Sequence, residues 1–330
     1  MATSATSNFR KNDDLWFSPE VIILRAQNHV FRIFVSILRA KSSVFADMFS
    51  FPSPPTSEVE TIDGIQVVDL HDDPEELGAF LKAIFDADFF LPPPTKTTTK
   101  LQDIIGILRM AHKYDVAFLR RRALEHLDLL YPIHLPGFEA FEGWDSVDHL
   151  LYSSEKDRHL IVIKAAVEVG ATWLLPAAYY YLCASTDIRE IMTDGSSWND
   201  IGDPQKMACI TGYTALLQYS PKMWQSLMTP SDEDICRDTA ECDARRLELA
   251  SALVSLGSIR HALGMLDPAW WASARQMFCL LCYSDTEHQY SLTKQEFWEE
   301  LPSLFGLPAW SDLEIARISA LNEATNHSAT

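Results

Sequence analysis

The chain has 330 residues, of which 47% are hydrophobic and 22% are charged, a composition that argues against a disordered protein and favours two domains. The formal net charge is −19, and −15 of it falls after residue 130, which argues against nucleic-acid binding because phosphates require basic residues. Residues 1–13 are expected to be a disordered polar N-terminus without the apolar core of a signal peptide, and no apolar run is long enough to span a membrane. We therefore expect a cytoplasmic or nuclear protein with neither a nucleic-acid nor a membrane partner.

The first half begins with a strand–turn–strand pattern. Runs of β-branched and aromatic residues at 21–24 and 30–35 predict two strands joined by a polar turn. Apolar residues at helical spacing then run to Phe49, after a serine at 42 or 43 that can cap the helix. The proline-rich stretch that follows must be a loop, and residues 66–70 predict a third strand.

A clear helix start follows at Asp73-Pro74-Glu75-Glu76. Asp73 can cap the free N–H groups, Pro74 suits the first helical position, and Glu76 can complete a capping box. Two more amphipathic helices, around 101–108 and 116–127, are expected after a Pro/Thr-rich loop. This order of elements predicts an α+β domain in which helices cap a short sheet.

Several blocks of this half resemble the BTB/POZ domain. They read "DLWF" at 14–17, "FRIFVSIL" at 31–38, "SSVFADMF" at 42–49 and "LRMAHKYDVAFLRRRALEHL" at 108–127. The resemblance implies a BTB/POZ-like protein-interaction domain at 14–130, whose partners would be a cullin or another BTB chain.

Three departures from the family pattern leave the partner open. Phe34 stands where the family usually has a histidine, on a strand face that we expect to be buried. Many dimeric members carry an extra strand before the domain, whereas only thirteen polar residues precede Asp14, so homodimerisation stays open. Many cullin-binding members carry a hydrophobic–any–Glu motif after the "MF" pair, and none occurs between Met48 and Ser57.

The second half is expected to be mostly α-helical. We expect a linker at 131–143, a helical C-terminal domain at 144–316 and a disordered tail at 317–330. The helices are expected at 160–169, 177–184, 204–219, 243–256, 268–281 and 293–301. The blocks "AVEVGATWLLPAAYYYLC" at 166–183 and "FWEELPSLFGLPAW" at 297–310 resemble the C-terminal region of a large group of fungal BTB proteins, which implies an architecture but no shared activity.

The six cysteines all lie beyond residue 180, and they predict reduced thiols or metal ligands rather than a disulfide scaffold. Cys279 and Cys282 form a C-x-x-C pair that can grip one face of a tetrahedral zinc ion, and Cys236 with Cys242 could close the site. His288 is an alternative fourth ligand. The competing interpretation is that these cysteines are buried, inert thiols that pack like small hydrophobic residues. No cofactor is required in either case, and a structural zinc ion is the one that the pattern allows.

The chain carries no phosphate-binding, zinc-protease or serine-hydrolase motif, so we predict that it is not an enzyme and has no catalytic residue. The leading hypothesis is a non-enzymatic BTB-type adaptor that presents other proteins to a cullin ubiquitin ligase complex. The alternative is a self-associating scaffold or transcriptional regulator that uses BTB contacts without a cullin. The partner-binding residues are expected at the end of the first helix and in its loop: Met48, Phe49, Phe51, Pro52, Pro54 and Pro55.

Overall fold

The computed structural model describes residues 10, 12, 16–51, 60–93, 99–140, 155–193, 195–230, 236, 238–255, 262–263 and 268–326. The chain divides into two compact units, Met1–Leu91 with Gly106–Ala123, and Pro92–Ile105 with Leu124–Thr330. The fold is α+β, as expected, with a small sheet near the N-terminus followed by helices. Within the described residues no helix is both long and apolar enough to cross a membrane.

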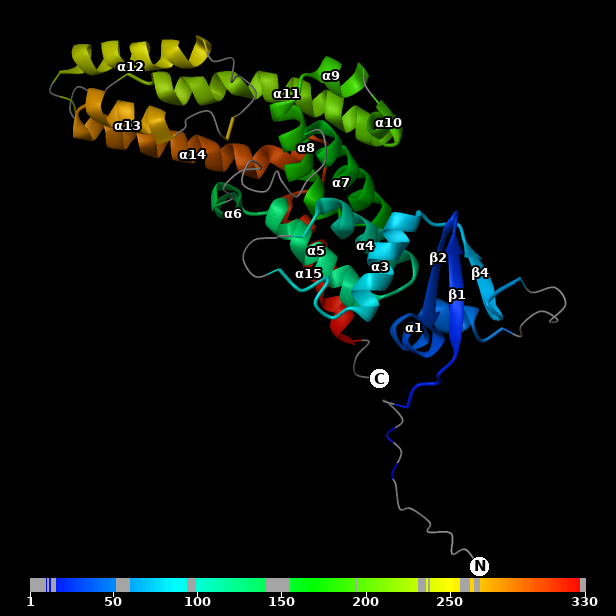
Figure 1. Ribbon diagram of the computed structural model, residues 1–330. Helices are drawn as coiled ribbons and strands as arrows, with labels where there is room; N and C mark the ends of the chain where they lie inside the picture. The colour runs from blue at the N-terminus through cyan, green and yellow to red at the C-terminus, as the bar shows by residue number, and fades with distance from the viewer. Residues whose placement is uncertain are drawn as a thin grey trace, which may run out of the picture. The chain divides into compact units, whose positions relative to one another are not determined.

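The first unit is built on a mixed four-stranded sheet with strand order β2-β1-β4-β3 (Figure 1). Strand β1 (Val21–Ala26) pairs antiparallel with β2 (His29–Phe34) and parallel with β4 (Ile65–Leu70), which pairs antiparallel with β3 (Thr61–Ile62). The central strand β1 buries both of its faces, since Ile22, Ile23 and Leu24 are all in the core.

Two short helices, α1 (Val35–Lys41) and α2 (Ser43–Met48), lie between β2 and β3. The predicted strand at 30–35 is therefore one residue too long, because Val35 already begins α1. The expectation that Phe34 is buried is wrong: its side chain is 48% exposed. The neighbouring Ile33 points into the core, and alternation along a strand places Phe34 on the opposite, solvent-facing side of this edge strand.

The predicted cap and first-turn proline are confirmed at the start of helix α3 (Pro74–Phe85), whereas no capping-box contact from Glu76 to Asp73 is among the described hydrogen bonds. The Asp73 carboxylate accepts hydrogen bonds from the backbone N–H groups of Glu75 and Glu76 at 2.9 and 3.1 Å, and Pro74 occupies the first turn. The Glu76 carboxylate accepts a hydrogen bond from Arg109 Nη1 at 2.6 Å. Helices α4 (Leu101–Lys113) and α5 (Ala117–Leu130) follow, each with residues in both units.

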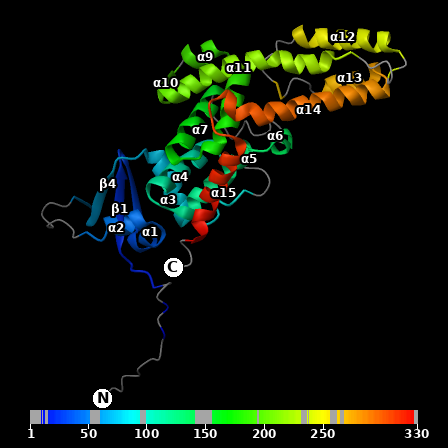
Figure 2. The same cartoon turned by 180° about the vertical axis from the view of Figure 1, so that it is seen from behind.

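The described remainder of the second unit is mostly helical, as Figure 2 shows from the reverse side. Its elements are α6 (Leu135–Ala140), α7 (Glu155–Val169), η4 (Thr172–Leu174), α8 (Leu175–Ser185), α9 (Ile188–Thr193), α10 (Gly195–Asn199), α11 (Asp203–Met228), α12 (Thr239–Ser255), α13 (Pro268–Met277), α14 (Leu280–Leu304) and α15 (Trp310–Asn326). Helices α11 and α14 pack along each other, and α12 and α13 lie beside them at one end in both views (Figures 1 and 2).

Two expectations about unstructured segments are corrected. Helix α6 lies inside the stretch 131–143 that was expected to be a linker, and Tyr131, Ile133 and Leu135 are buried there. Helix α15 runs to Asn326, through most of the stretch expected to be a disordered tail. A long-range contact accounts for the second correction, since Arg317 Nε donates to Asp128 Oδ2 at 2.6 Å, and Asp128 Oδ1 also accepts from Trp173 Nε1 at 2.7 Å.

Candidate functional site

The predicted partner-binding residues lie at and beyond the end of α2. Phe45 within this helix is buried, and the side chains that follow become more exposed. Ser42 Oγ caps the helix by accepting from Phe45 N at 3.0 Å, and the Phe45 ring is fully buried. Met48 and Phe49 are half-buried, whereas Phe51 is 74% exposed. The three predicted prolines, Pro52, Pro54 and Pro55, lie outside the described residues.

Tyr114 contacts both Phe45 and the capping residue Ser42. Its ring stacks on Phe45 with centroids 4.3 Å apart, and its backbone oxygen accepts a hydrogen bond from Ser42 Oγ at 2.5 Å. Its hydroxyl donates to the buried carboxylate of Asp72, which Lys113 also reaches, and burial raises the pKa of Tyr114 well above its usual range. These contacts hold the first turn of α2 to the rest of the first unit, and the exposed Phe51 lies three residues beyond the last residue of this helix.

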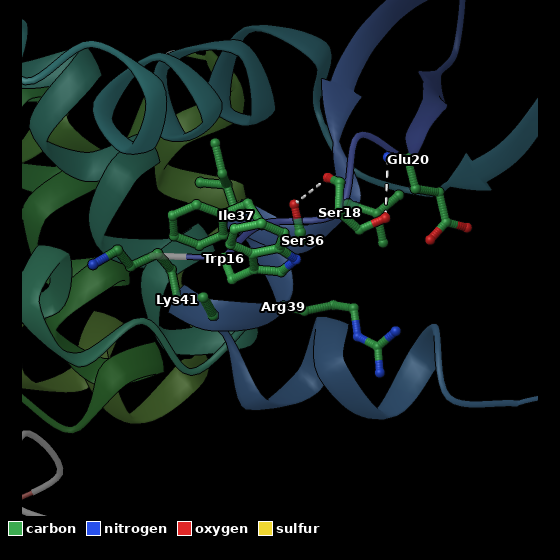
Figure 3. Close-up of a pocket in the computed structure, with 10 residues that line it drawn as sticks. Trp16, Ser18, Glu20, Ser36, Ile37, Arg39 and Lys41 are labelled. Carbon is green, nitrogen blue, oxygen red and sulfur yellow. Dashed lines mark hydrogen bonds between the residues drawn. The ribbon is translucent and has the colours of Figure 1, made fainter. Parts of the chain in front are cut away.

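A second feature of the first unit is a groove of about 670 Å³ beside α1 (Figure 3). Two aromatic side chains that precede β1 line it, Trp16 and Phe17, which are 67% and 48% exposed. Ser36 Oγ donates to the backbone oxygen of Ser18 at 2.9 Å and ties this extended segment to the first turn of α1 (Figure 3). Two exposed aromatic side chains thus line this depression, which the sequence analysis did not predict.

The strongest chemical feature lies in the second unit, where Cys236, Cys242, Cys279 and Cys282 come together. Their four sulfur atoms all lie within 4.8 Å of one another, and the sulfurs of Cys236 and Cys279 are 3.8 Å apart. Cys279 is exposed and the other three are buried. The sequence prediction that these two pairs can form one metal site is confirmed, because such a group could hold a metal ion.

Two helix starts position three of these four thiols. Cys242 lies in the first turn of α12, and Cys279 is the N-cap of α14, where its sulfur accepts a hydrogen bond from Cys282 N at 3.5 Å. That backbone hydrogen bond lowers the pKa of Cys279 to about 7, whereas burial raises the pKa of Cys242. In the metal-free chain the exposed thiol therefore ionises before the buried one.

The spacing of the four sulfurs is compatible with one shared metal ion. Zinc–sulfur bonds of about 2.3 Å require sulfurs about 3.8 Å apart, so the sulfurs need to close in by about 1 Å at most. The proposed substitute ligand His288 is exposed on α14 and does not belong to the group. Cys183 and Cys209 lie elsewhere in the core, where the Cys183 thiol donates to the Cys209 carbonyl oxygen at 3.6 Å.

No protein-family model, no curated protein and no solved structure matches this chain. The BTB/POZ resemblance stays a prediction carried by the sequence blocks described above. The sequence analysis also missed the residues around the cysteines, above all Arg246 and Thr286. A signal for them exists, because each follows a cysteine by one helical turn, Arg246 after Cys242 and Thr286 after Cys282.

Proposed function

We propose that this chain is a non-enzymatic protein-interaction protein of the BTB/POZ type, an adaptor that presents bound proteins to a cullin ubiquitin ligase. The observation that carries the proposal is the exposed Phe51, which lies three residues beyond the end of α2. The buried stack of Phe45 on Tyr114 holds this helix in the first unit. Protein interfaces concentrate their binding energy in a few large side chains, aromatic ones among them, presented on a fixed backbone. The short sheet capped by helices and the four sequence blocks support the family assignment.

The direct test is a calorimetric titration of the purified chain with the amino-terminal region of a cullin. Phe51→Ala should weaken binding at least about tenfold, since a central aromatic residue of an interface contributes more than about 1–2 kcal/mol. Phe85→Ala is the matched control, because Phe85 is an exposed phenylalanine at the end of another helix of this unit. Equal binding by the two variants would show that the end of α2 is not the docking surface.

A second candidate function, self-association as a scaffold or transcriptional regulator, is favoured by the groove beside α1. Exposed aromatic rings next to a depression are the kind of surface that a second copy of the chain can cover. Light scattering across a concentration series distinguishes the two functions. A strict monomer at all concentrations rules out the scaffold, whereas a dimer that Trp16→Ala dissociates supports it.

We further propose that the four clustered cysteines bind a structural zinc ion in the second unit. Four thiolates with no open position suit a closed tetrahedral zinc site, and the ion would join the segment at Cys236 to the first turns of α12 and α14. The alternative is that these are inert thiols, three of them buried and Cys279 serving as the N-cap of α14.

Metal analysis of the purified chain tests the zinc proposal. We expect about one equivalent of zinc, and less than about half an equivalent would contradict it because closed thiolate sites bind zinc tightly. Cys279→Ser should release the ion and lower the thermal stability of the second unit. Cys209→Ser is the control for zinc content, because Cys209 is a cysteine of the same unit outside the cluster.

A further inference from the structure

A buried arginine lies one helical turn from the cysteine cluster. Arg246 follows Cys242 by four residues on α12, and its side chain is only 5% exposed. Its Nη1 atom donates to Thr286 Oγ1 at 2.7 Å and to the backbone oxygen of Leu227 at 3.2 Å. A buried guanidinium is rare in proteins, and it needs hydrogen-bond acceptors and a counter-charge to be stable.

The hydrogen bonds of Arg246 connect it through Thr286 to the backbone of Cys282 in α14. Thr286, which accepts from Arg246, donates its own hydroxyl to the backbone oxygen of Cys282 at 2.8 Å. The guanidinium carbon also lies 5.3 Å from the ring centroid of Phe278, the residue before Cys279. Arg246 therefore braces α12 against the start of α14 and the last turn of α11, so it helps to set the separation of the two cysteine pairs.

The charge of the metal-bound cysteines gives Arg246 a second role. Four thiolates around a divalent ion carry a net charge of about −2, and burying such a charge without compensation is strongly unfavourable. The N-terminus of α14 offers a partial positive charge, and Arg246 offers a full one. Asp243 forms an ion pair with Arg246, its carboxylate 3.8 Å from Nε, and is partly exposed, so this pair competes only weakly for the guanidinium.

We infer that Arg246 is a positioning residue of the metal centre, which stabilises the metal-bound tetrathiolate by its charge and holds the two cysteine pairs together through Thr286. This inference rests on the proposed zinc site. It adds a role at the cysteine cluster to a cation that already braces α12 against α14 and α11.

The test measures the zinc affinity of the full chain by competition with a chromophoric chelator. Arg246→Met keeps the length of the side chain and removes its charge, and it should weaken zinc binding by about 10- to 100-fold, the range for residues that support metal ligands. Arg245→Met is the matched control: Arg245 is the neighbouring residue on α12, is 40% exposed and pairs with Glu241. The zinc affinity of the Arg245→Met variant should stay at the wild-type value.

A second variant keeps the inference testable if Arg246→Met does not fold. Asp243→Asn removes the competing carboxylate from a partly exposed position, and zinc should bind about two- to fivefold more tightly, the range for a partly exposed ion pair. Unchanged or weaker binding would contradict a role for the charge of Arg246.

The outcomes separate this inference from the zinc proposal. If the wild-type chain takes up no zinc, the proposed metal site is wrong and the role of Arg246 is lost with it. If the wild-type chain binds zinc and Arg246→Met binds it equally well, the zinc site stands and the inference is overturned.

Discussion

Replacing Arg317 with methionine should destabilise the second unit, because it removes a cation from a largely buried carboxylate, that of Asp128. Asp128 is only 12% exposed and accepts hydrogen bonds from Arg317 Nε at 2.6 Å and from Trp173 Nε1 at 2.7 Å. Burial already raises the pKa of Asp128, although Arg317 counteracts the shift. The variant keeps the apolar part of the side chain, and the Asp128 carboxylate retains the hydrogen bond from the Trp173 indole.

The size of the loss follows from the burial of the pair. A charged hydrogen bond contributes about 1.5–3 kcal/mol, and breaking a fully buried ion pair removes about 3–5 kcal/mol. Because the Arg317 side chain is 29% exposed, we take the lower range and expect a loss of about 2 kcal/mol at pH 7. Protonation relieves the unpaired carboxylate, so the difference from the wild type should shrink as pH falls through the raised pKa of Asp128 in the variant.

Urea unfolding followed by tryptophan fluorescence measures this loss through the shift in midpoint at constant slope. Arg189→Met is the matched control, because Arg189 is 89% exposed and forms an ion pair with the nearby Asp187; it should change stability by less than about 0.5 kcal/mol. A loss below about 0.5 kcal/mol for Arg317→Met, or a loss that does not depend on pH, would refute the reasoning.

Three further predictions concern single sites. Asp73→Ala should destabilise the first unit by about 1 kcal/mol in thermal unfolding, because the free N–H groups at the start of α3 lose their cap, whereas Asp73→Asn should retain most of the stability. Gly212→Ala should cost about 1–3 kcal/mol, because its new methyl group meets the buried ring of Phe305; full stability in calorimetry would show that this contact is looser than described. In the metal-free chain the alkylation rate of Cys279 by iodoacetamide should rise with pH to a plateau above its pKa of about 7, and zinc should suppress the reaction; equal rates with and without zinc would contradict the site.

The features that sequence predicts well are those that local residues determine. Asp73 and Pro74 specify the start of α3 by themselves, since a cap and a first-turn proline act within four residues. The C-x-x-C pair predicts one half of the cysteine cluster for the same reason, because its two thiols belong to a single helix start. Metal chemistry alone, rather than any local pattern, suggested that the distant pair at Cys236 and Cys242 joins it.

Contacts between residues far apart in the sequence determine where α11 and α15 end, and the sequence prediction missed both ends. Helix α11 was expected to end at residue 219, yet it continues through Pro221 because Met223 and Leu227 beyond it are buried. Their burial outweighs the roughly 3 kcal/mol that a proline costs inside a helix. In the same way, the buried Asp128 keeps Arg317 and its helix in place where a polar sequence suggests disorder, and no local pattern contains that partner.

The most direct test of the adaptor proposal is affinity purification of the tagged chain from its native cells, with quantitative mass spectrometry of the partners. The wild-type chain and Phe51→Ala are compared with the control Phe85→Ala. We expect a near-stoichiometric cullin that the wild type and Phe85→Ala retain and that Phe51→Ala loses. The same partners at the same yield from all three chains would contradict docking through the end of α2.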